Sequence, residues 1–210
     1  MENSVQRYGW SERWASVVSM ALHPALVALW MVVMTMVGWA SPLDYPKNVQ
    51  LFVIGNTAFI TLLMPVAFLW LQRVLIRHRG GEMTLRRRRV SQLAMMVVSY
   101  VACGWMFDEI VVLFLVRKVM YTLAMVAFVV LAMEYVRPLS HHTALFGALV
   151  GMMWMLLYVG NVALFTPFVA AILCGGLLLT SRLMLGENLF ATWGGFFGGL
   201  VISLIVFLLI

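Results

Sequence analysis

The chain has 210 residues, of which 64% are hydrophobic and only 10% are charged, whereas an ordinary soluble domain is about a quarter charged. This composition excludes a soluble globular domain of the usual kind and indicates an integral membrane protein. The net charge of +6 does not indicate a nucleic-acid partner, because much of the positive charge lies in one short segment, residues 73–89, as is typical of a topology signal.

Apolar runs fill most of the chain, and each is close to the roughly 20 residues that a helix needs to cross a bilayer. They lie near residues 16–39, 51–72, 90–107, 110–134, 143–162, 163–180 and 189–210. A backbone surrounded by lipid must satisfy its own hydrogen bonds, which favours α-helices. The sequence therefore predicts an all-α, polytopic membrane helical bundle of about seven spans, forming a single transmembrane domain over residues 1–210.

Two boundaries between these runs are weakly marked. Arg117 and Lys118 interrupt the fourth run, so we expect that span to begin near Val119 after a short or re-entrant segment, and a count of six spans is the alternative. The junction near Asn161 and Pro167 is the other weak point, because proline marks a bend as readily as a break.

The distribution of arginines predicts the topology. The loop from Arg73 to Arg89 holds Arg77, Arg79 and the run of arginines at 86–89, and such loops stay on the cytoplasmic side. Counting two spans at each step, residues 135–142, residues 181–188 and the N-terminus belong to the same face. We also expect this basic loop to attract anionic membrane lipid.

Glycines recur in the last three predicted spans, and small residues spaced four apart let helices approach closely in lipid. They are Gly147, Gly151, Gly175, Gly176, Gly194, Gly195, Gly198 and Gly199. We expect these spans to form one tight bundle, and glycine-rich faces are also candidate surfaces for protein partners.

Two short polar loops on the predicted cytoplasmic face carry residues suited to bind a phosphate. The candidates are Arg137, Ser140, His141, His142, Ser181, Arg182 and Asn188. Arginine offers a planar fork that matches phosphate oxygens, serine adds a donor, and histidine can supply a proton near neutral pH. The alternative for Arg182 is that it extends to the lipid headgroups, as cations at span ends commonly do; Glu187 could instead pair with it.

We expect no metal ion and no cofactor. His23 and His78 lie elsewhere in the chain, and no carboxylate closely accompanies the pair at 141–142.

The segment SRLMLGENLFATWGGFFGG, residues 181–199, resembles the third signature of the type 2 phosphatidic acid phosphatase superfamily, the membrane lipid-phosphate phosphatases. LSHH at 139–142 resembles the second signature, with Ser140 and His142 at its serine and histidine positions. His23-Pro24 and LRRRRVSQ are similar to features of a compact bacterial branch. The resemblance implies a phosphatase-like core over about residues 119–210 and a place in the bacterial inner (cytoplasmic) membrane. The arginine distribution assigns the N-terminus to the cytoplasmic side.

The resemblance also implies a phosphohistidine mechanism, but the chain departs from the signatures. Asn188 stands at the position of the nucleophilic histidine, Thr192 at that of its aspartate, and Val130 at that of the first-signature lysine. Any hydrolysis would therefore need His142 as general acid or nucleophile, or His141, or directly activated water. Arg182, Ser181, Ser140, Arg137 and Asn188 would bind phosphate.

Two functional hypotheses result, and the sequence does not decide between them. The first is a membrane protein that binds an isoprenoid or glycerolipid phosphate, with dephosphorylation of that lipid left open. The alternative is a catalytically inactive structural or accessory subunit of a membrane complex. A small transporter is less favoured, because only Arg117 and Lys118 could lie within a span.

Overall fold

The computed structural model describes residues 10–37, 45–78, 84–159 and 164–209, and within these ranges the chain is helical with short turns and no strand. The elements are α1 (Trp10–Ala21), α2 (Pro24–Met36), α3 (Lys47–Ala58), the π-helical η1 (Phe59–Leu63), α4 (Met64–His78), α5 (Leu85–Met106), the 3-10 helix η2 (Val111–Leu113), α6 (Phe114–Met133), α7 (His141–Tyr158), α8 (Phe165–Met184) and α9 (Leu189–Leu209). The all-α prediction is confirmed.

The first predicted span is a pair of helices. The apolar run predicted near residues 16–39 forms α1 and α2, which meet at an angle of 49°. Pro24 has no N–H and cannot continue α1, but it suits the first position of a new helix. His23 precedes it, and its Nδ1 accepts a hydrogen bond from the Ala25 N–H at 3.2 Å. The break therefore places a histidine inside the bundle.

Four helices in the described residues are long and apolar enough to cross a membrane, or up to five if the bent pair is one span. The four are Lys47–Gln72, Val111–Met133, Phe165–Met184 and Leu189–Leu209. This supports a membrane protein, but the predicted count of seven spans is not confirmed. Helices α5 and α7 coincide with predicted runs, yet they begin with Arg86–Arg89 and with two histidines, which shortens their apolar stretches.

Helix α6 begins at Phe114 and includes both basic residues of the weakly marked fourth run. The prediction that this helix starts near Val119 is therefore wrong. Arg117 pairs with Asp108 at 3.0 Å, and the Lys118 ammonium lies 4.6 Å from the centre of the Phe207 ring. Because both cations have partners near the helix end, the helix can continue through them.

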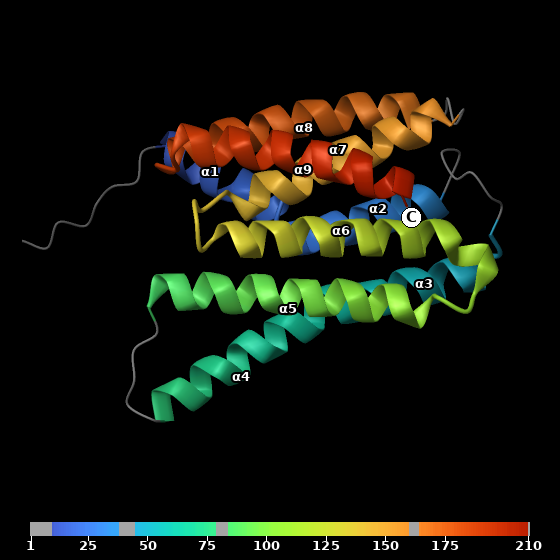
Figure 1. Ribbon diagram of the computed structural model, residues 1–210, viewed down its shortest axis with the longest axis horizontal. Coiled ribbons are helices and arrows are strands. Elements are labelled where there is room, and N and C mark those ends of the chain that lie inside the picture. Colours follow the sequence, from blue (N-terminus) through green and yellow to red (C-terminus); the bar gives the residue numbers. More distant parts are fainter. Residues whose placement is uncertain (1–9, 38–44, 79–83, 160–163, 210) are drawn as a thin grey trace, which may run out of the picture.

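Helix α7 is the centre of the fold. It packs against α2, α6, α8 and α9, and nearly all of its residues from Thr143 to Leu156 are buried. Helix α1 packs on α8, and α5 packs on α6. Helices α3, α4 and α5 lie on the side of the bundle away from α8 and α9 (Figure 1).

The polar loops gather at one end of the bundle, as the count of spans predicted. Arg89, residues 137–140 and residues 186–188 line one pocket, and the connections of these segments lie at the same end (Figure 1). At the opposite end the Tyr45 hydroxyl donates to the Val112 carbonyl at 2.8 Å. Residues 1–9 lie outside the described residues, so the predicted place of the N-terminus is not tested.

Close packing of α7 on α9 depends on glycines from both helices. A Cβ at Gly199 would overlap the Ala144 carbonyl, and one at Gly147 would overlap the Phe196 carbonyl. Gly151 and Gly195 are similarly confined by Ser203 and Thr143. The predicted role of glycine in packing is thus confirmed for this pair. Gly176 and Gly198 instead have no neighbouring atom within 4 Å of such a Cβ.

We expect Gly199→Ala to lower the free energy of unfolding by about 1–3 kcal/mol, because the added methyl forces two helix backbones apart. The matched control is Gly198→Ala, whose methyl meets nothing, so it should not destabilise the protein and should raise the free energy of unfolding by about 0.5–1 kcal/mol, because alanine favours a helix over glycine. Thermal unfolding of both variants in detergent measures the difference. Equal effects at the two positions would contradict the packing described here.

Candidate functional site

The sequence SRLMLGEN, residues 181–188, forms the end of α8 and the turn before α9. Gly186 has a φ of +84°, a conformation that glycine adopts without a steric cost, and it ends α8. The Glu187 N–H donates back to the Arg182 carbonyl at 3.1 Å. Asn188 Oδ1 then accepts from the Phe190 N–H at 2.9 Å and caps the start of α9. The turn therefore returns Glu187 to the last turn of α8.

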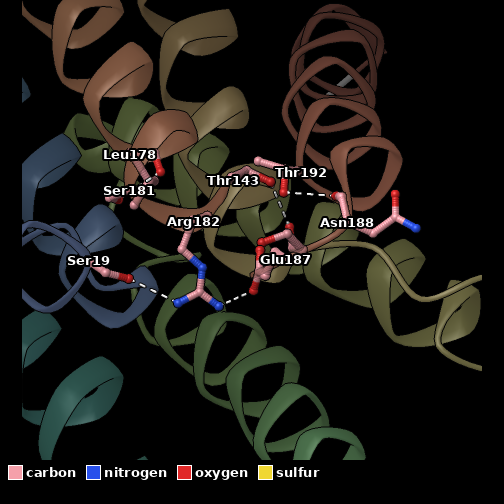
Figure 2. A network of polar contacts seen from close by, with 9 residues as sticks. Ser19, Thr143, Leu178, Ser181, Arg182, Glu187, Asn188 and Thr192 are labelled. Atoms are coloured by element: carbon pink, nitrogen blue, oxygen red, sulfur yellow. Dashed lines mark hydrogen bonds and ion pairs between the residues drawn. The ribbon is translucent and has the colours of Figure 1, made fainter. Parts of the chain in front are cut away.

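The Arg182 side chain points toward Ser19 of α1 and toward Glu187 (Figure 2). Its guanidinium pairs with Glu187, as the sequence suggested, and also donates to Ser19 Oγ of α1 at 3.0 Å. The two charged side chains are only 17% and 22% exposed. Arg182 therefore joins α8, the α8–α9 turn and α1.

The start of α7 is tied to the start of α9. The Ser140 N–H donates to the Ala191 carbonyl at 3.0 Å, and the Thr143 hydroxyl donates to the Ser140 carbonyl at 3.1 Å. Two helix N-termini, each the positive end of a helix dipole, are thereby brought side by side.

Three histidines meet beneath this end of the bundle. The His141 and His142 ring centroids are 4.2 Å apart, and the His23 and His142 centroids are 5.4 Å apart. The expectation that His23 lies away from the pair is therefore wrong, because the bend between α1 and α2 points it at α7. Burial, with a smaller contribution from the charge of Arg182, lowers the pKa of His141 to about 4, so this imidazole is neutral at pH 7.

No group of three or more His, Cys, Asp or Glu side chains in the described part of the chain could hold a metal ion. Five polar side-chain atoms around Arg182 are nevertheless buried without a hydrogen-bond partner among the described residues. They are Ser140 Oγ, His141 Nε2, His142 Nδ1, Arg182 Nε and Glu187 Oε2. Buried polar atoms are normally paired, so this cluster is a polar region within an otherwise apolar end of the bundle.

A pocket of about 310 Å³, here called the loop pocket, opens beside this cluster. Its lining residues are Arg89, Arg137, Pro138, Leu139, Ser140, Gly186, Glu187, Asn188, Phe190 and Ala191. The Arg137 guanidinium lies 3.5 Å from the centre of the Phe190 ring, which restrains it by a cation–π contact. Two arginines and the starts of α7 and α9 therefore face one cavity.

The structure divides the predicted site residues into two groups. Arg137, Ser140 and Asn188 line the loop pocket, whereas Ser181, Arg182, His141 and His142 do not. Ser181 is buried and donates to the Leu178 carbonyl at 2.8 Å.

Asn188 and Thr192 have local roles in α9. The Thr192 hydroxyl donates to the Asn188 carbonyl at 3.1 Å, and the Asn188 side chain points away from Arg182 (Figure 2).

Sequence reasoning missed three residues around the site. Ser19 had no signal, because its place depends on how α1 packs against α8. Arg89 belongs to the basic run 86–89. That it, and not another arginine of the run, lines the loop pocket follows only from helix periodicity together with the fold. Phe190 lies two residues after the Asn188 cap, in the first turn of α9, which could have indicated an aromatic side chain near the pocket.

Comparison with protein-family models, with curated proteins and with solved structures gave no match. These comparisons therefore do not test the resemblance to lipid-phosphate phosphatases.

The Glu187 carboxyl gives the site a predictable response to acid. Burial alone would raise its pKa, but the hydrogen bond and charge of Arg182 outweigh burial and lower the pKa. A lowered pKa in the folded state means that the ionised pair stabilises the protein above the ordinary value of 4.5 and that this stabilisation is lost as the pH falls through the lowered pKa.

We expect the stability difference between wild type and Glu187→Gln to be largest above pH 4.5 and to shrink on further acidification. Thermal unfolding in detergent over a pH series that crosses this value measures it. Comparison with the variant is required, because protonation of buried His141 also destabilises the protein in acid. A difference that does not vary with pH would contradict the ion pair.

Proposed function

We propose that this protein binds the phosphorylated headgroup of a membrane lipid, an isoprenoid or glycerolipid phosphate, in the loop pocket and does not hydrolyse it. The observation that carries the proposal is the arrangement of Arg89 and Arg137 around a cavity that also receives the starts of α7 and α9. Guanidinium groups and helix N-termini both stabilise phosphate oxygens.

The charge balance of the loop pocket supports an anionic ligand. Glu187 is the one acidic residue in the pocket lining. Its charge is neutralised by an ion pair with Arg182, which does not itself line the pocket. Arg89 and Arg137 therefore contribute an uncompensated positive charge. Ser140 adds a buried hydroxyl at the pocket wall, close to the Glu187 carboxyl.

Binding without hydrolysis is favoured by the position of the histidines. An attacking imidazole must reach the phosphorus atom, but neither His141 nor His142 belongs to the pocket lining. The Asn188 amide is not a nucleophile, and its oxygen is occupied in capping α9. The resemblance to lipid-phosphate phosphatases therefore supports a phosphorylated lipid as the ligand more than it supports hydrolysis of that lipid.

The membrane and the orientation are part of this proposal. Arginine-rich loops stay in the cytoplasm, so we assign the end that carries Arg86–Arg89 and the loop pocket to the cytoplasmic face of a bacterial inner membrane. Anionic lipids of that leaflet would gather at the basic segment.

The alternative of an accessory subunit without a ligand has less support. It would use glycine-rich spans as partner surfaces, but Gly147, Gly151, Gly195 and Gly199 are occupied in packing α7 against α9. Gly176 and Gly198 remain without close neighbours. A role as an accessory subunit would also not explain why Arg89 and Arg137 line the same pocket.

The test is binding of phosphatidate and of isoprenoid phosphates to the purified protein in detergent, with phosphate release measured in parallel. We expect saturable binding and no release of phosphate. Arg137→Ala and Arg89→Gln should each weaken binding about tenfold or more, because each removes a charge-assisted hydrogen bond.

Arg87→Gln is the matched control, since Arg87 is an exposed arginine of the same run that lines no described pocket, and it should bind as the wild type does. Phosphate release that His142→Ala abolishes would overturn the non-hydrolytic part of the proposal. Equal binding by wild type, Arg137→Ala and Arg89→Gln would overturn the loop pocket as the binding site.

A further inference from the structure

A second hollow, of about 300 Å³, lies where α5 meets α2 and the η1–α4 segment. We call it the α4–α5 groove. Its lining residues are His23, Ala25, Leu62, Pro65, Val66, Leu69, Trp70, Arg88, Gln92 and Met96. It shares no lining residue with the loop pocket, so the two are separate sites.

The basic run of α5 supplies a different arginine to each hollow. Consecutive residues of an α-helix point about 100° apart, so Arg88 and Arg89 diverge. Arg89 lines the loop pocket. Arg88 lines the α4–α5 groove, together with Gln92 and Met96, which follow it at intervals of four residues on the same helix face.

The lining of the α4–α5 groove changes from polar to apolar along α5. Arg88 and Gln92 lie near the start of the helix, and Met96 lies further along it. Leu62, Val66 and Leu69 supply an apolar wall from one face of η1 and α4. The groove is therefore shaped for an amphipathic ligand with a polar head and an apolar chain.

The groove is open to the surrounding membrane. The span Lys47–Gln72, which forms one wall, is only 22% buried, less than the other candidate spans. Helix α4 runs obliquely to α5 (Figure 1), and a hydrogen bond of 2.8 Å from Ser91 Oγ to Gln72 Oε1 joins the two helices. Lipid chains are the medium next to such a wall, so a lipid can enter from the side.

We propose that the α4–α5 groove binds one anionic membrane lipid, with its phosphate at Arg88 and one acyl chain along Leu62, Val66 and Leu69. No acidic side chain lines the groove, and Arg88 is a cation there, so charge complementarity favours an anionic headgroup over a zwitterionic one. Trp70, which is 65% exposed, stands at the rim as aromatic residues do at the headgroup level. The inference is independent of the function proposed for the loop pocket.

The test uses phosphatidylglycerol that carries a photoreactive group in one acyl chain, incorporated with the full-length protein into vesicles. After illumination, mass spectrometry locates the labelled peptides. We expect labelling concentrated in residues 62–70 and around Met96, and about fivefold less of it in Arg88→Gln, because one arginine near an anionic surface is removed.

Three comparisons make the result decisive. Arg87→Gln, in the same helix but outside the groove, should label as the wild type does, and the phosphatidylcholine analogue should label residues 62–70 less than phosphatidylglycerol does. Arg137→Ala should leave this labelling intact even if it abolishes binding in the loop pocket. Labelling spread evenly over the lipid-facing helices, or equal labelling in Arg88→Gln and Arg87→Gln, would overturn the site.

Discussion

The ion pair between Arg182 and Glu187 is the interaction on which the functional end of this protein depends. The pair joins the last turn of α8 to the turn that follows. The Arg182 guanidinium also donates a hydrogen bond to Ser19 and so holds α1. Because a buried guanidinium without a partner is costly, the pair fixes the conformation of the α8–α9 turn. Glu187 in turn forms part of the wall of the loop pocket.

Glycine packing and helix capping complete the same end of the molecule. Gly147 and Gly199 allow α7 and α9 to touch along their backbones, and the Ser140–Ala191 hydrogen bond sets the two helix starts side by side. The basic run of α5 then borders both hollows, with Arg89 on one side and Arg88 on the other. One short sequence of arginines, which is typical of a topology signal, thus also borders the two hollows that we propose as binding sites for anionic lipid.

The helices and much of the site could be predicted because their signals are local. The apolar runs predicted where the helices lie. The short separation of Arg182 and Glu187 in the sequence suggested their ion pair, and the count of spans predicted that the polar loops lie at one end. The cap at Asn188 is also encoded locally, by a glycine and an asparagine two residues apart between two helices. The contact of His23 with His142 and the bond from Ser19 could not be predicted, since both depend on how α1 and α2 pack against α7 and α8.

The central claim is that Arg182 organises the loop pocket without itself being the ligand for phosphate. A double-mutant cycle of Arg182→Gln and Glu187→Gln, measured for stability and for binding of phosphatidate, tests it most directly. We expect each single variant to destabilise the protein and the double variant to cost less than the sum of the two. The double variant should still bind phosphatidate, because two glutamine side chains can hydrogen-bond across the same turn and add no net charge to the pocket wall. Additive losses of stability, or a folded double variant that no longer binds, would contradict this account.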